Sequence, residues 1–147
     1  MELRPFQTPH PPLWNTSASA DAMRAAGREG SNIMVMKHPD DCKVMLRAYM
    51  SGWRETHKGN HPLPKLGLTR HVFVSRSQRT AEERGQFGFN GWYRSHSAMW
   101  KRFDSSRGEG DSSHYVRNRA LVFGTPEFVA EELSEQLKAA GDINYLV

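Results

Sequence analysis

The organisation of this chain is decided by Pro5–Gly30, which reads PFQTPHPPLWNTSASADAMRAAGREG. The prolines at positions 9, 11 and 12 can lie neither inside a helix nor in a central strand, so an element begins after them. Leu13–Thr16 is short and rich in strand formers. From Ala20 onward the apolar residues recur at helical spacing, and Gly30 is suited to end that helix. The stretch therefore predicts a strand, a turn of small residues and a helix.

The turn between this strand and helix is a candidate anion site. Ser19 is a good N-cap residue for the helix. The backbone N–H groups at a helix N-terminus attract anions, most commonly phosphate. Every strand-turn-helix unit has this shape, so a plain connection without a ligand stays open as the simpler alternative.

The rest of the chain continues the alternation of strand and helix. Short apolar runs predict further strands over residues 32–36, 68–75 and 143–147. Apolar residues at intervals of three and four predict one helix after Pro39, an aromatic-rich helix in the middle of the chain, and a last helix after Thr125. Such alternation within a single domain, residues 1–147, is typical of a parallel sheet with helices outside it.

Local patterns give three further predictions. Thr80 and Glu83 form a capping-box pattern, which predicts that the aromatic-rich helix begins just after Thr80. Residues 105–113 are rich in Gly and Ser, and we expect a mobile loop there. The glutamates of the last helix, including Glu131 and Glu132, lie opposite its apolar stripe, so we expect a solvated face.

Composition limits the class of protein. A chain of 147 residues with 37% hydrophobic residues predicts one globular domain with a real core. The net charge is +4, but the basic residues are scattered among 16 acidic ones, so no nucleic-acid partner is predicted. No apolar run approaches the ~20 residues of a membrane helix, and no apolar leader precedes the domain, which predicts a cytoplasmic protein without a membrane. The single cysteine, Cys42, fits a reducing compartment.

Motifs for catalysis or metal binding are not evident. The seven histidines form neither His-x-His nor His-x-x-x-His on a helix, since His57 and His61 lie in a stretch containing Gly and Pro. There is no P-loop and no G-x-S-x-G elbow. We therefore predict no metal site and assign no catalytic residue. Composition and spacing alone indicate only an α/β protein with one possible anion site.

Several stretches nevertheless resemble the luciferase-like, flavin-dependent monooxygenases. PFQTPHPPLWNTSAS followed by AMRAAGREG resembles the fifth β-α unit of that family. RHVFVSRSQRTAEERGQF is similar to the seventh strand and its helix, and GWYRSHSAMWKRF to the aromatic helical insertion after it. GTPEFVAEELSEQLKAAGDINYLV resembles the helix and strand that close the family's barrel.

This resemblance implies a fold, a cofactor and a site. The implied fold is the C-terminal half of a (β/α)8 TIM barrel, with four parallel strands and outer helices. The implied cofactor is reduced FMN, or alternatively a deazaflavin, with which the family oxidises an organic substrate using O2. Its phosphate contacts, carried over by position, fall on Ser17, Ala18 and Ser19, and Met34–Met36 would lie near the ring system.

The resemblance also implies what this chain lacks. The family's first four strands, and the residues that act on the oxygenated flavin, have no counterpart here, so no catalytic residue can be carried over. We expect a truncated half that is inactive alone, and whether the chain is itself an enzyme stays open. An open half leaves two strand edges and an apolar inner face. Its expected partner is therefore the missing N-terminal half or a second copy in a homo-oligomer. The alternative is a non-catalytic module that binds flavin or dimerises.

Overall fold

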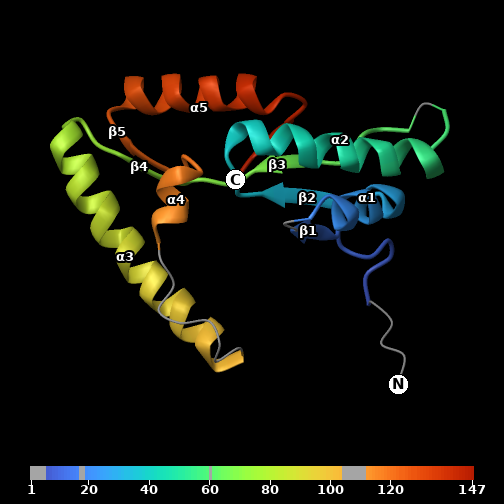
Figure 1. The fold of residues 1–147 in the computed structure, drawn as a ribbon, viewed down its shortest axis with the longest axis horizontal. Coiled ribbons are helices and arrows are strands. Elements are labelled where there is room, and N and C mark those ends of the chain that lie inside the picture. Colours follow the sequence, from blue (N-terminus) through green and yellow to red (C-terminus); the bar gives the residue numbers. More distant parts are fainter. Residues whose placement is uncertain (1–5, 17–18, 60, 104–111) are drawn as a thin grey trace.

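The computed structural model describes residues 6–16, 19–59, 61–103 and 112–147. The elements in chain order are β1 (Trp14–Thr16), α1 (Ala20–Glu29), β2 (Asn32–Val35), α2 (Pro39–Thr56), β3 (Leu66–Leu68), β4 (His71–Val74), α3 (Gln78–Phe103), α4 (Ser113–Arg117), β5 (Leu121–Gly124), α5 (Pro126–Ala140) and β6 (Tyr145–Leu146). Figure 1 shows α1 and α2 beside β1, β2 and β3, while α3 extends away at the opposite end of the molecule.

All strand pairs of the described residues are parallel. The larger sheet has the order β1-β2-β3-β6, and β4 and β5 form a second sheet of two strands. Only Thr69 and Arg70 separate β3 from β4. The amide of Arg70 donates to the carbonyl of Val147, after β6, at 2.9 Å, whereas the amide of His71 donates to Ala120, ahead of β5, at 2.8 Å. The hydrogen-bonding partner of the chain therefore changes at Arg70, from the C-terminal segment after β6 to the segment that leads into β5.

These sheets confirm the predicted fold class, a parallel α/β architecture, but the strands differ in number from those expected. The single strand predicted over 68–75 contains the last residue of β3 and the whole of β4, which are separate strands because the hydrogen-bonding partner changes between them. β5 is an additional strand that periodicity does not reveal, since its four residues run directly into the cap of α5 at Thr125.

The main core lies between α1, α2 and the larger sheet. Its buried side chains are Met23, Ala26, Ile33, Val35, Cys42, Leu46, Tyr49, Trp53, Leu66, Leu68 and Ala140. The two helices cross with their backbones in contact: a Cβ on Gly27 would collide with the carbonyl oxygen of Tyr49, and one on Gly52 with that of Arg24. This close crossing holds α1, and so the turn before it, in a defined position against the sheet.

A second, aromatic cluster lies between α3 and the smaller sheet. Its buried members are Phe89, Tyr115 and Ala120, against which Met36, Tyr93, Leu121 and Phe123 also pack. Gly85 allows α3 to lie directly on the ring of Phe123, because a Cβ there would come within 2.5 Å of that ring. The predicted aromatic-rich helix is confirmed, and it has 26 residues.

Helix ends were predicted correctly for α1 and α5. Ser19 has extended backbone angles and its side chain accepts from the amide of Ala22, so it caps α1. Gly30 ends α1 in the left-handed region, at φ 71°. Thr125 caps α5 by accepting from the amide of Phe128.

The start of α3 was predicted wrongly. The helix begins at Gln78, and the hydroxyl of Ser77 accepts from the amide of Thr80 at 3.3 Å. Ser77 therefore takes the position that the sequence pattern assigned to Thr80. Of the loop predicted over 105–113, residues up to 111 lie outside the described residues, and α4 begins at Ser113.

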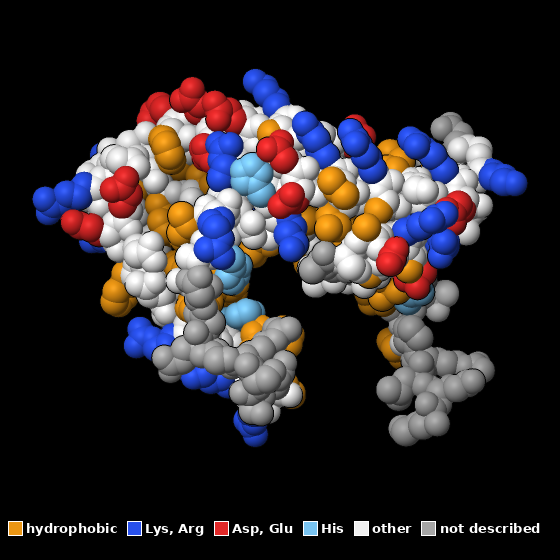
Figure 2. All heavy atoms as spheres, viewed as in Figure 1, with side chains coloured by type: hydrophobic (Ala, Val, Ile, Leu, Met, Phe, Trp, Pro, Cys, Tyr) orange, Lys and Arg blue, Asp and Glu red, His pale blue; other side chains and the backbone are white. Residues whose placement is uncertain are grey.

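Large apolar side chains lie exposed on the smaller sheet and at the C-terminus. Val72 and Val74 of β4 are 44% and 48% exposed, and Tyr145, Leu146 and Val147 are exposed to similar extents. Figure 2 shows the molecule hollowed on its lower side, between α3 and the region of α1 and β1. The two sheets therefore leave apolar surface uncovered, as an open half-barrel is expected to do.

No helix of the described segments is long and apolar enough to cross a membrane.

Candidate functional site

The predicted phosphate site lies where β1 leads into α1. Ser17 and Ala18 lie outside the described residues, so only Ser19 of the predicted set has a described position. The oxygen of its side chain lies 3.3 Å from the amide nitrogen of Ala22, and its carbonyl accepts from the amide of Met23 at 3.1 Å. Ser19 is exposed. The residue thus stands at the N-terminus of α1, as the anion-site hypothesis requires.

The chemistry of this helix end suits a phosphate only in part. The amides of Ala20 and Asp21 have no hydrogen-bond acceptor among the described residues, and these are the donors that a helix N-terminus offers to an anion. The carboxylate of Asp21, in the same turn, would oppose an anion. The backbone of this turn therefore fits a phosphate, while its single charged side chain does not contribute to binding one.

Met34 and Met36, implied to lie near the cofactor ring, have different surroundings. Met34 lies in β2 and is half-buried, whereas Met36, just beyond that strand, packs against the aromatic cluster. Met36 is thus already in contact with protein side chains.

A buried polar network lies where the chain changes strand partners. Arg70 is 6% exposed; it donates through Nε to Oε1 of Gln136 and through Nη2 to the carbonyl of Lys37, at 3.0 Å. Gln136 is fully buried and donates to the carbonyl of Arg119, at 3.0 Å, and to Glu132, at 2.6 Å. Arg119 pairs with Glu132 at 2.7 Å. The network joins the end of β3, the turn before β5 and α5.

This network corrects one prediction and identifies residues that periodicity did not. Glu132 is not simply part of a solvated face, because hydrogen bonds from Arg119 hold the pKa of its carboxyl below the usual range. Burial lowers the pKa of the Arg70 guanidinium, which nevertheless donates to three acceptors of the chain itself, on Gln136, Thr69 and Lys37. Since these donors are already used, the network is suited to holding elements together rather than to binding a ligand.

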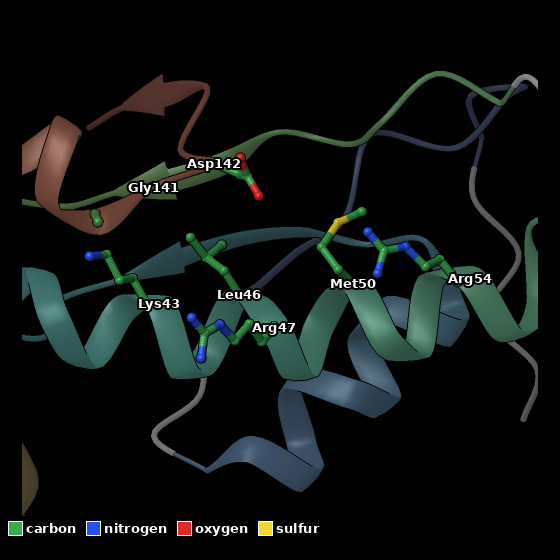
Figure 3. A pocket seen from close by; sticks show the side chains of 8 residues that line it. Lys43, Leu46, Arg47, Met50, Arg54, Gly141 and Asp142 are labelled. Carbon is green, nitrogen blue, oxygen red and sulfur yellow. The ribbon is translucent and has the colours of Figure 1, made fainter.

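A basic groove runs along α2 toward the turn after α5. It encloses about 310 Å³. Figure 3 shows Lys43, Arg47 and Arg54 projecting from α2 beside the apolar side chains of Leu46 and Met50. None of these three cations has an ion-pair or hydrogen-bond partner among the described residues. The groove can attract anions, but it is open and its cations are exposed.

The described residues contain no group of three or more His, Cys, Asp or Glu side chains that could hold a metal ion. Cys42 is buried, which raises the pKa of its thiol, and its Sγ lies 3.7 Å from the carbonyl oxygen of Lys37. A buried thiol with a raised pKa is a poor nucleophile.

Comparison with known proteins places this architecture in a family. The luciferase-like monooxygenase family matches residues 2–144. The uncharacterized protein y4wF of Sinorhizobium fredii is 25% identical and aligns with 99% of this chain and 43% of its own length.

Two solved structures show the likeness in three dimensions. One is the oxygenating constituent of 3,6-diketocamphane monooxygenase from Pseudomonas putida, a type II Baeyer–Villiger monooxygenase in complex with FMN. It superposes with a TM-score of 0.65 at 19% identity, over 93% of this chain and 41% of that chain. The other is the coenzyme F420-dependent tetrahydromethanopterin reductase of Methanopyrus kandleri. Its TM-score is 0.59 at 15% identity, over 92% of this chain and 44% of that chain.

The parallel strands, the helices between them and these superpositions define an α/β protein consistent with half of a TIM barrel. The chain belongs to the luciferase-like monooxygenase family. It spans less than half the length of these relatives.

Proposed function

We propose that this chain supplies the phosphate-binding part of a flavin-dependent monooxygenase, which uses reduced flavin and O2 to oxidise an organic substrate. The observation that carries the proposal is the family match over residues 2–144. The position of Ser19 at the N-terminus of α1 is in keeping with it, because the amides there are suited to a phosphate oxygen. Ser17, Ala18 and Ser19 are the proposed contacts.

Reduced FMN is the proposed cofactor, with a deazaflavin as the alternative. One structural relative is described in complex with FMN, and another is named for its dependence on coenzyme F420. The bound flavin would supply the redox chemistry. This chain's residues would hold the phosphate through the amides of Ala20 and Asp21 and the turn before them.

By itself the chain is proposed to bind flavin without turnover. Flavin oxygenation requires an enclosure that keeps water from the reacting centre. The uncovered apolar side chains of Val72, Val74 and Leu146 indicate that the described residues do not complete such an enclosure. A complete site would need the other half of a barrel or a second copy of this chain.

Anaerobic titration of the full chain with reduced FMN, followed by addition of oxygen and a family-type substrate, tests this proposal. We expect binding to weaken when Ser19 is replaced by Asp, since the added carboxylate still caps α1 but repels phosphate. Replacement of Ser19 by Asn, a neutral cap, is the matched control. Equal binding by the wild type and Ser19→Asp would contradict the proposed phosphate contacts.

The second candidate is a non-catalytic module that binds flavin or dimerises. The exposed apolar residues of β4 and β6 favour it, because they provide a surface for association. Oxidised product above the protein-free control would favour the enzyme. Tight flavin binding without product, even with the remaining half of a family barrel supplied in trans, would favour the module.

A further inference from the structure

A hollow lined by aromatic side chains lies between β4 and α3, away from the proposed phosphate contacts. It encloses about 280 Å³, and its lining includes His71, Arg84, Gly88, Phe89, Trp92 and Phe123. We call it the aromatic hollow. Its size and largely apolar lining suit a small ligand of one or two rings, since sites for drug-sized molecules begin at ~300 Å³.

Gly88 lines this hollow, and neither close packing nor backbone geometry requires a glycine at this position. A Cβ at this position would meet no atom within 4 Å, and its φ is not in the left-handed region. Glycine in a helix interior is destabilising relative to alanine. Gly85, one turn earlier, is different, because α3 there lies directly on the ring of Phe123. Gly88 has no such neighbour, and its one structural effect is to leave the hollow open.

The polar groups of the hollow have unused hydrogen-bonding capacity. Nε2 of His71 is buried and has no hydrogen-bond partner in the described part of the chain. The imidazole lies against Trp92, with ring centroids 4.4 Å apart. Arg84 has no ion-pair or hydrogen-bond partner among the described residues and is exposed.

The spacing along α3 orders these groups. Arg84, Gly88 and Trp92 are successive residues four apart, so they lie on one face of the helix, one turn from each other. A guanidinium therefore stands at one end of the hollow and an indole at the other, with the open position of Gly88 between them. This arrangement matches a flat ring that carries an acidic group at one end.

We infer that the aromatic hollow binds a small planar aromatic carboxylate, with its ring over Gly88 beside Trp92 and Phe89 and its carboxylate on Arg84. The site uses none of the residues proposed to hold flavin phosphate. This second site goes beyond the proposed function, and its ligand binding can be tested without flavin.

Calorimetric titration of the full chain with 2-naphthoate tests this inference. We expect saturable binding, and binding a few-fold weaker for 2-naphthalenemethanol, which keeps the rings but lacks the charge, because the ion pair with the exposed guanidinium of Arg84 is screened by solvent. Arg84→Gln should remove this preference for the acid. Absence of saturable naphthoate binding to the wild type, or an unchanged preference in Arg84→Gln, would overturn the inference.

The substitution Gly88→Leu should abolish binding, because the new side chain occupies the hollow. The variant should fold, since a Cβ there meets nothing and leucine is a better helix former than glycine. Gly91→Leu is the matched control: it lies on the same helix, its Cβ is equally unobstructed, and it does not line the hollow. The inference is contradicted if Gly88→Leu has a wild-type circular dichroism spectrum and still binds naphthoate. Binding lost in Gly88→Leu but kept in Gly91→Leu supports it.

Discussion

Buried polar side chains connect separate segments of this fold by hydrogen bonds. Arg70 lies where β5 replaces β6 as the strand partner of the chain, and its guanidinium donates to the carbonyl of Lys37, just beyond β2, and to Gln136 of α5. Tyr49 has a similar role in the main core, where its hydroxyl donates to the carbonyl of Ser31 at 2.7 Å. Burial raises the pKa of Tyr49 to about 12, so it stays a hydrogen-bond donor over the physiological pH range.

His71 is expected to make stability depend on pH near neutrality. Burial, with a smaller contribution from the charge of His96, lowers the pKa of His71 below its ordinary 6.5. The unfolded chain therefore binds a proton below about pH 6.5 while the folded chain does not, so the free energy of unfolding falls as the pH drops through that value. Urea denaturation between pH 8 and pH 5.5 measures this fall.

His71→Phe should flatten that pH dependence, whereas His10→Gln, at an exposed position, should leave it unchanged. The window lies above the range in which carboxylates such as Glu132 titrate, because the pKa of that group is lowered. If the free energy of unfolding falls equally steeply with pH in His71→Phe, a group other than His71 causes the pH dependence.

At the scale of elements, α1 and α2 form the most tightly joined pair. Gly27 and Gly52 allow the two backbones to touch. Ion pairs from Arg24 and Arg28 to Glu55 tie the same helices together at the surface, and the hydrogen bonds from Arg28 and Arg24 lower the pKa of Glu55. Exposed ion pairs contribute little to stability, so the close backbone contact is the stronger constraint.

Two alanine substitutions should therefore have opposite effects. Gly27→Ala forces the helices apart and is expected to lower the free energy of unfolding by about 1–3 kcal/mol. Gly91→Ala on α3, where a Cβ meets nothing within 4 Å, should raise it by up to about 1 kcal/mol. Chemical denaturation of both variants decides this, and equal effects would show that the α1–α2 contact is looser than described.

At the scale of the whole molecule, the two sheets leave apolar surface and strand edges uncovered. β4 pairs with β5 alone among the described strands, and Val72 and Val74 lie exposed on it. The apolar C-terminal residues around Leu146 are exposed as well. Uncovered strands of this kind favour association with another chain.

We expect the chain to sediment as a species larger than one 147-residue polypeptide at micromolar concentration. The double substitution Val72→Lys and Val74→Lys should shift it toward the monomer, because charged residues on a strand prevent edge association. Val44→Lys, an exposed valine on α2, is the control that should leave the sedimentation unchanged. A wild-type chain that sediments as a monomer would contradict this expectation.

The sequence by itself determined the features that depend on near neighbours. Apolar periodicity predicted α2, α3 and α5, and short-range hydrogen bonding predicted the caps at Ser19 and Thr125. The resemblance of quoted stretches identified the family, which the match over residues 2–144 confirms. Only the tertiary structure decided where strands exchange partners. The break at Arg70, the strand character of β5 and the burial of Gln136 each depend on residues far apart along the chain. Their physical cause is long-range pairing of backbone and side-chain polar groups, which leaves no periodic pattern in the local sequence.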